Sequence, residues 1–203
     1  MDIILVRHGE TEWNKLGLCQ GISDICLSVV GNKQAELLAA SLKDDDIKYI
    51  YSSNLKRAYE TAKTIAKFHD TEVRIDSGFR EMDQGIFEGL PFIELRETRG
   101  DLLLSWRSDP ENYRIPNGET LTEVQHRAYS SIKNIIESHS PSTVLIVTHN
   151  FTIITLLCKF LGKNLSEFYK FKIKETSKHV ITLKDGIANI RIYNNTEHLS
   201  GLV

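Results

Sequence analysis

The chain has 203 residues, of which 41% are hydrophobic and 26% charged, and this composition is typical of one globular domain. Its 25 lysines and arginines nearly balance its 27 aspartates and glutamates, which argues against a nucleic-acid-binding or membrane-surface protein. Three cysteines, an apolar start interrupted after Val6 and apolar runs too short for a bilayer predict a cytoplasmic protein with reduced thiols.

Strand and helix patterns alternate along the chain. Four apolar runs are typical of strands buried on both faces: Ile3–Val6, Ile47–Ser52, Glu72–Asp76 and Thr143–His149. Apolar residues at helical spacing predict four helices: Gly31–Leu42, Leu55–Phe68, Leu121–Ser138 and Asn150–Leu161. Near the C-terminus, His179–Tyr193 holds two alternating runs around Asp185-Gly186, which predicts an antiparallel hairpin at one edge of the sheet.

This order predicts an α/β fold of three layers, α/β/α, with a mainly parallel mixed sheet and right-handed crossovers. We treat residues 1–203 as a single domain. The least regular region, 78–118, is expected to pack over the C-terminal ends of the strands, with 87–115 as a small inserted helical cap. Ligands of open α/β sheets bind outside the carboxyl ends of the strands, so we expect the site there.

Polar residues end three of the predicted strands: Arg7-His8, Ser52-Ser53 and His149. Guanidinium groups suit phosphoryl oxygens because they donate paired hydrogen bonds and keep their charge, which makes Arg7 and Arg57 candidates. His8 is the candidate nucleophile, since a neutral imidazole can attack phosphorus and form a phosphoramidate. His149 would then stabilise the transferred oxygens, either as an imidazolium or as a hydrogen-bond donor.

The leaving alkoxide needs a proton, which a carboxylic acid in a partly dry site can supply. The segment Phe79–Leu90 offers three such groups: Glu81, Asp83 and Glu88. Taken singly, each of these residues has an ordinary structural explanation, and the functional interpretation depends on their occurring together.

Several blocks of the chain resemble, in register, the histidine phosphatase superfamily, also called the phosphoglycerate mutase-like family. They are LVRHGETEWN (Leu5–Asn14), QGISDICLSVVGNKQA (Gln20–Ala35), SSNLKRAYETA (Ser52–Ala62), REMDQGIFEGL (Arg80–Leu90), PNGETL (Pro116–Leu121) and VLIVTHN (Val144–Asn150). The resemblance spans roughly Asp2 to Leu161. A lone RHG would be weak evidence, whereas matching blocks in register are strong.

The resemblance implies roles for individual residues. His8 corresponds to the phosphorylated nucleophile, and Glu81 falls on the position of the general acid. Arg7, Arg57 and His149 correspond to the phosphate pocket. Asn14, Gln20 and Gly21 match the loop that contacts phosphate or the near side of the substrate. Asn150 is a further substrate-binding candidate for a different reason, because it begins a predicted helix whose backbone N–H groups suit an anion. The resemblance further implies a small phosphomonoester as the substrate, no metal or organic cofactor, and a homodimer as an open expectation because dimers are frequent in the family.

The family contains phosphatases and mutases, and the short interval between Leu90 and Ile115 favours hydrolysis. Its phosphatases act on phosphoserine, on α-ribazole 5′-phosphate or on broad sets of monoesters, and the substrate stays open among them. Because Tyr193–Leu199 resembles tails of the first two groups, His198 is a hypothetical contact for the non-phosphate end of the substrate. Cofactor-dependent phosphoglycerate mutase is the alternative function.

Two rival interpretations belong to other classes. One is a metallohydrolase using His8, Glu10, Glu81 and His149 as ligands, although the chain lacks HxH, HExxH and DxH spacings and Arg7 would repel a cation. The other is a non-catalytic phosphate-binding protein on the same fold, which the presence of all five core groups argues against.

Overall fold

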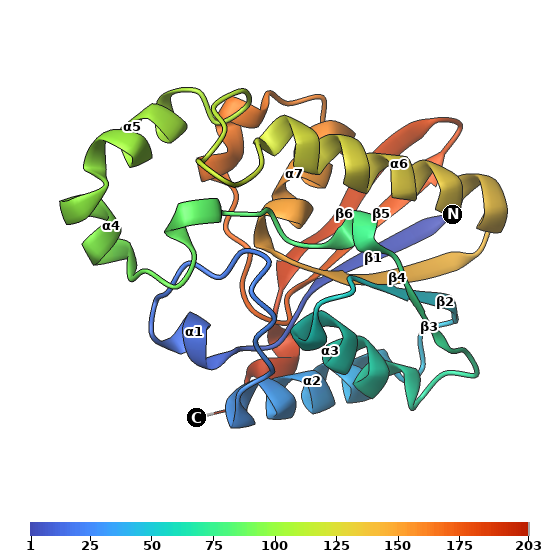
Figure 1. The fold of residues 1–203 in the computed structure, drawn as a ribbon. Coiled ribbons are helices and arrows are strands. Elements are labelled where there is room, and N and C mark those ends of the chain that lie inside the picture. Colours follow the sequence, from blue (N-terminus) through green and yellow to red (C-terminus); the bar gives the residue numbers. More distant parts are fainter. Residues whose placement is uncertain (203) are drawn as a thin grey trace.

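The computed structural model describes residues 1–202, whose strands form one six-stranded mixed sheet (Figure 1). The strands are β1 (Asp2–Arg7), β2 (Ile47–Ser52), β3 (Val73–Ile75), β4 (Thr143–Thr148), β5 (Lys178–Lys184) and β6 (Ile187–Asn195). Their order is β3-β2-β4-β1-β5-β6; the first four are parallel, and β5 is antiparallel to β1 and to β6. The predicted α/β fold with a mainly parallel mixed sheet is confirmed.

Helices cover both faces of the sheet (Figure 1). The lower pair in this view is α2 (Val29–Leu42) and α3 (Lys56–Ala66), and the upper pair is α6 (Leu121–His139) and α7 (Asn150–Phe160). Successive strand side chains point to opposite faces. Ile4 and Val6 therefore belong to the core under α2 and α3, and Ile3 and Leu5 to the core under α6 and α7. Burial on both sides explains why β1 and β4 are continuously apolar. The prediction of the same burial for Glu72–Asp76 was wrong, because β3 is an edge strand whose Arg74 and Ile75 are exposed.

Side-chain caps set where two of the helices begin. The Ser28 hydroxyl accepts a hydrogen bond from the Gly31 amide at 2.9 Å, so α2 begins at Val29, two residues before the predicted start. Hydrophobic periodicity misses this turn because the Val29 side chain is 87% exposed. In α6, Thr120 and Glu123 form a reciprocal capping box, and the helix starts at Leu121 as predicted.

The remaining helices are short. They are α1 (Glu12–Lys15), α4 (Phe92–Thr98), α5 (Gly100–Ser108) and the 3₁₀ turns η1 (Ser77–Phe79), η2 (Gly85–Phe87), η3 (Leu165–Lys170) and η4 (Glu197–Leu199). Figure 1 shows α4 and α5 beyond the carboxyl ends of β1 and β4, on the side where the cap was expected. The amide of Phe92, the first residue of α4, donates to the carbonyl of Gly17 at 3.2 Å, which ties this region to the loop after α1.

No helix within residues 1–202 combines the length and the apolar content that crossing a bilayer requires.

His179 makes the stability of the fold sensitive to acid. It is buried in β5, where Nδ1 accepts from the Asn194 amide at 3.2 Å and Nε2 lies 3.2 Å from the Ser177 hydroxyl. Burial lowers the pKa of His179 from 6.5 to about 4. Because the folded pKa is depressed, the unfolded chain takes up the proton first, so this contribution to stability is complete above pH 6.5 and is lost progressively as the pH falls to about 4.

We expect the free energy of unfolding to decrease as the pH falls from 7 toward 4, with roughly 3 kcal/mol at most from His179 alone. Urea denaturation at several pH values measures it. His179→Gln should lower stability at pH 7 and flatten the pH dependence, whereas the same change at the exposed His126 of α6 should leave the slope as it is. Equal slopes for wild type and His179→Gln would contradict the assignment.

Candidate active site

A cavity of about 410 Å³ lies at the carboxyl ends of the strands and brings the predicted residues together. Eight of the nine predicted site residues line it: Arg7, His8, Asn14, Gln20, Gly21, Arg57, Glu81 and Asn150. The ninth, His149, is fully buried, and its ring centroid lies 5.1 Å from that of His8. Residues that are far apart in sequence therefore share one site, while their individual roles remain predictions.

The backbone fixes the tautomer of His8. The residue directly follows β1, and its amide donates to the Thr148 carbonyl at 3.0 Å, which extends the parallel pairing. Its Nδ1 lies 2.7 Å from the Gly9 carbonyl oxygen, which can only accept, so Nδ1 carries the hydrogen and Nε2 keeps its lone pair. Burial, together with the charges of Arg57 and Arg7, lowers the pKa of His8 well below 6.5. The ring is therefore neutral and nucleophilic at Nε2.

Gly9 is required by a close approach between this strand end and α2. A Cβ at position 9 would lie 2.5 Å from the Gly31 carbonyl oxygen, which is much shorter than a van der Waals contact. The Gly9 amide donates to the Thr61 hydroxyl of α3 at 3.1 Å. His8 is thus held between the two helices of the lower layer.

Arg57 is the fixed cation of the site. It is fully buried near the start of α3, and its Nε donates to His8 Nε2 at 3.3 Å. Nη1 and Nη2 donate to the carbonyls of Ser23 and Gly21, both at 2.7 Å. Burial lowers the pKa of Arg57 to about 10, so the guanidinium stays charged at neutral pH. Its position beside Nε2 of the predicted nucleophile suits a charge that holds phosphoryl oxygens.

Arg7 is held by a segment that the sequence analysis did not single out. Its Nη1 donates to the Ile173 carbonyl at 2.6 Å, and Nη2 forms an ion pair with Glu175 Oε1 at 2.9 Å. Glu175 itself lines the cavity. Both residues lie beyond Leu161, where the family resemblance ended, and about 166 positions from Arg7, so no local pattern points to them.

His149 ends β4 and precedes α7. Its Nε2 lies 2.8 Å from the Ser53 hydroxyl, and its buried Nδ1 has no partner among residues 1–202. Burial and the charge of Arg57 lower the pKa of His149 well below 6.5. Of the two roles that the sequence left open, the geometry favours a neutral hydrogen-bonding group over an imidazolium.

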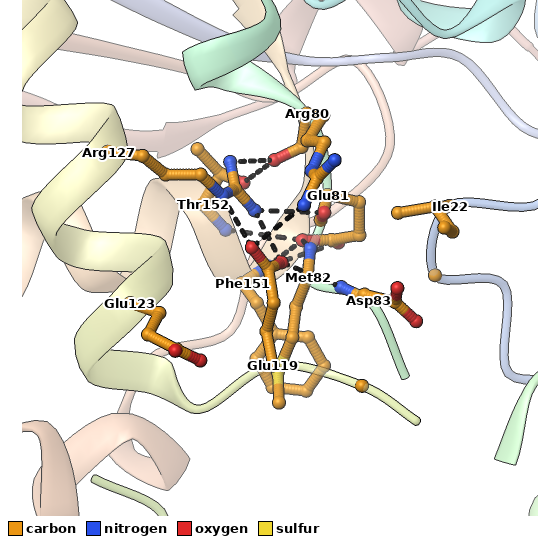
Figure 2. Close-up of polar contacts among 12 residues, drawn as sticks. Ile22, Arg80, Glu81, Met82, Asp83, Glu119, Glu123, Arg127, Phe151 and Thr152 are labelled. Atoms are coloured by element: carbon orange, nitrogen blue, oxygen red, sulfur yellow. Dashed lines mark hydrogen bonds and ion pairs between the residues drawn. The ribbon is translucent and has the colours of Figure 1, made fainter. Parts of the chain in front are cut away.

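Backbone amides hold the Glu81 carboxylate at the start of α7 (Figure 2). Oε1 accepts from Met82 at 2.9 Å, Phe151 at 3.2 Å and Thr152 at 3.3 Å, whereas Oε2 accepts only from Phe151, at 3.2 Å. Burial raises the pKa of Glu81 above 4.5, although the Met82 hydrogen bond and the charge of Arg57 oppose the rise. Oε2 is the oxygen with more freedom to carry a proton. Asp83 and Glu88, the other candidate acids, do not line the cavity.

Arg127 of α6 fixes the backbone around Glu81 (Figure 2). It donates to the carbonyls of Gly78, Arg80 and Glu81 at 2.7 to 3.0 Å, and its ion pair with Glu119 measures 3.0 Å. No sequence pattern singles out Arg127, because an arginine in an amphipathic helix is ordinarily solvated. One signal was present in the sequence. Glu119 lies in the PNGETL block that resembles the family, but the block does not indicate that Glu119 pairs with Arg127.

Asn14 and Gln20 are joined through Thr11. The Oδ1 of Asn14 accepts from the Thr11 amide at 3.1 Å, and Gln20 Oε1 lies 2.6 Å from the Thr11 hydroxyl. With both oxygens engaged, the amide nitrogens of the two residues have no protein partner within the described chain. Both residues line the cavity, so these nitrogens are suited to donate to an anion.

His198 is not brought to the cavity. It belongs to η4, and its Nε2 lies 3.1 Å from the hydroxyl of Thr176. The residue does not line the cavity, so the hypothesis that it contacts the substrate is not supported. Nor do three or more His, Cys, Asp or Glu side chains of residues 1–202 gather as a metal-binding group, which gives no support to the metallohydrolase interpretation.

Comparison with known proteins decides the family. Residues 3–196 match the family model of the histidine phosphatase superfamily (branch 1). The chain belongs to this superfamily. Membership agrees with the site geometry and confirms the predicted class, a phosphatase enzyme, and the fold class that the resemblance implied.

Three relatives of this histidine phosphatase show which members it is similar to. "Phosphoserine phosphatase 1" of Hydrogenobacter thermophilus is 36% identical over 197 residues, covering 97% of this chain and 93% of that protein. The structure of a phosphoserine phosphatase mutant from Entamoeba histolytica in complex with phosphoserine has a TM-score of 0.85 and 31% identity, with 98% of each chain covered. The α-ribazole phosphatase of Shigella flexneri has a TM-score of 0.87 and 26% identity, with 97% of each covered.

Proposed function

We propose that this histidine phosphatase hydrolyses small-molecule phosphate monoesters through a phosphohistidine on His8. The observation that carries the proposal is the lone pair of His8 Nε2, fixed beside the Arg57 guanidinium in the cavity that Glu81 also lines. An attacking nitrogen, a fixed cation and a buried acid are the three groups that phosphoryl transfer to a side chain needs.

In the first step His8 Nε2 attacks phosphorus, the bond to the ester oxygen breaks, and Glu81 protonates the leaving alkoxide. In the second step the Glu81 carboxylate takes a proton from water, whose oxygen attacks phosphorus and displaces His8 as inorganic phosphate forms. Arg7 and Arg57 hold the phosphoryl oxygens, and His149, Asn14 and Gln20 add neutral hydrogen bonds.

The charges around the cavity favour hydrolysis over the mutase alternative. A mutase has to hold a bisphosphate, whereas the cations lining this cavity, within residues 1–202, are Arg7 and Arg57 beside the neutral His8. Two guanidinium groups provide the positive charge for one phosphoryl group and leave none for a second. A non-catalytic phosphate-binding function would need neither the Nε2 lone pair nor the buried Glu81.

The apolar part of the cavity lining favours an apolar leaving alcohol. Its side chains include Leu18, Phe87, Phe92, Leu95, Leu103, Trp106, Ile115 and Phe151. None of these carries a positive charge that could form an ion pair with a carboxylate such as that of phosphoserine or 3-phosphoglycerate, and the one donor among them is the indole N–H of Trp106, which has no partner within residues 1–202. Arg107 stacks on the Phe92 ring, 5.4 Å from its centroid, and does not line the cavity. We therefore propose an uncharged, partly aromatic alcohol as the preferred leaving group, a description that α-ribazole 5′-phosphate meets.

A panel of monoesters tests this proposal. We expect higher kcat/KM for 1-naphthyl phosphate and α-ribazole 5′-phosphate than for phosphoserine and 3-phosphoglycerate, with phosphate released and no mutase product in a parallel assay. Phe92→Ala should lower kcat/KM for the aromatic esters roughly tenfold, since it removes apolar contact area, and should affect phosphoserine little. Ile93→Ala, next to it and 71% exposed, is the matched control. A preference for phosphoserine would overturn the proposed leaving group but would leave the proposed phosphatase activity standing.

A further inference from the structure

Glu88 is a carboxylate that the proposed reaction does not use, yet both of its oxygens are engaged. It directly follows η2 and is half-buried. Oε1 accepts from the amides of Ile22 at 2.7 Å and Gln84 at 3.2 Å, and Oε2 accepts from the amide and the hydroxyl of Ser23 at 2.9 and 2.5 Å. Four hydrogen bonds to an ionised group form a strong and specific attachment. Glu88 thus fastens the loop at residues 21–23 to the segment that follows Glu81.

The same loop holds Arg57 from its other side. The Gly21 carbonyl belongs to the peptide unit whose amide hydrogen is on Ile22, and the two groups of a trans peptide point in opposite directions. The Ile22 amide donates to Glu88, and the Gly21 carbonyl accepts from Arg57 Nη2 at 2.7 Å. Ser23 adds a second link through one residue and two successive peptide units, because its amide binds Glu88 at 2.9 Å and its carbonyl accepts from Arg57 Nη1 at 2.7 Å.

Gly21 adapts the backbone to this arrangement. Its φ is +49°, and a Cβ at this position would lie 1.8 Å from Glu88 Oε1. Any side chain would therefore occupy the place of the carboxylate. The loop and the Glu88 side chain fit each other only because residue 21 is glycine.

We infer that Glu88 is a positioning residue, which orients the Arg57 guanidinium through the peptide groups of Gly21, Ile22 and Ser23. It does not line the cavity and so acts through Arg57. Arg57 needs such support because its guanidinium has to stay beside His8 Nε2, 3.3 Å from Nε, so that its charge meets the phosphoryl oxygens when that nitrogen turns from Arg57 to phosphorus. Chains of hydrogen bonds through polarised peptide groups strengthen one another in a buried site.

A double-mutant cycle with Glu88→Gln and Arg57→Gln tests this inference. Glutamine keeps the shape, but its amide nitrogen would face backbone N–H groups that cannot accept a hydrogen bond. In the chain with Arg57 we expect Glu88→Gln to weaken binding of inorganic phosphate, measured by calorimetry, about tenfold, and to lower kcat/KM for p-nitrophenyl phosphate similarly. With Arg57→Gln present, adding Glu88→Gln should change either quantity less than about twofold. Glu94→Gln, an exposed carboxylate on α4, is the control.

Equal losses in both backgrounds, or no loss when Arg57 is present, would overturn the inference. Ser23→Ala removes one of the four hydrogen bonds and keeps the carboxylate, so it serves if Glu88→Gln does not fold; a loss of about threefold that vanishes with Arg57→Gln is expected. The inference rests on the proposed function only for its kinetic readout. If no ester is hydrolysed, the proposed function fails, while phosphate binding still decides the role of Glu88.

Discussion

His8→Ala should abolish turnover and phosphoenzyme formation. The substitution removes the Nε2 lone pair that attacks phosphorus and leaves Arg7 and Arg57 to bind phosphate, so kcat should fall on the order of 10⁴-fold or more. Alkaline quenching with ³²P-labelled substrate, or the intact mass of the trapped protein, measures the phosphoenzyme directly. The label should be acid-labile and stable to alkali in wild type.

His126→Ala is the matched control, because this histidine is exposed on α6 and lies in no part of the site. Its activity and phosphoenzyme level should equal those of wild type. Retention of label by His8→Ala would place the phosphoryl group on another residue and would overturn the proposed mechanism. Retained inorganic phosphate binding by the inactive variant would show that the pocket is intact.

Glu81→Gln should slow phosphoryl transfer in proportion to how poor the leaving group is. An alkyl phosphate, whose alkoxide needs a proton, should lose on the order of 10²- to 10⁴-fold in kcat, and p-nitrophenyl phosphate much less. Single-turnover kinetics on both esters measure the difference. Glu97→Gln on the exposed face of α4 controls for the loss of one carboxylate near the site. Equal losses for the two esters would contradict the assignment of Glu81 as the acid.

The pH dependence of kcat/KM should reflect the protonation states of His8 and Glu81. His8 must be neutral, and its pKa lies well below 6.5, so activity falls only on the strongly acidic side. Glu81 must be protonated, and because burial raises its pKa above 4.5, activity falls as the pH rises through that higher value. The optimum therefore lies between mildly acidic and neutral pH. In Glu81→Gln, kcat/KM for p-nitrophenyl phosphate, which the variant still hydrolyses, should no longer fall as the pH rises.

Arg7, His8, Arg57 and His149 could be predicted to lie together because their positions follow from where strands end and helices begin. A buried strand ends at Arg7, and a helix begins near Arg57. Parallel strands present their carboxyl ends at the same edge, so residues after β1 and β4 had to meet. These are consequences of strand burial and of sheet topology, both of which a sequence pattern reports directly.

What could not be predicted depends on pairs of residues that are far apart in sequence. The contact of Arg127 with Glu81 and the contact of Arg7 with Glu175 have no periodic signal, because each needs the finished fold to bring the partners together. The helices α4 and α5 were expected only as a small helical cap within 87–115, without individual bounds. Neither has a side-chain N-cap, and Leu104 of α5 is 65% exposed, so the amphipathic pattern is weak.

The attachment of Arg7 to Ile173 and Glu175 limits how far the chain could be truncated from its C-terminus. The motif blocks that resemble the family, and every residue proposed to react, lie before Leu161, although the match to the family model extends from residue 3 to residue 196. β1 nevertheless pairs on one side with β5, and its terminal arginine is held by the segment just before that strand. A shortened chain that keeps all the family motifs would leave one edge of β1 unpaired and Arg7 without its supports. The short motifs that carry the proposed chemistry therefore end before the part of the chain that supports them, and the family match, which reaches residue 196, includes that supporting part.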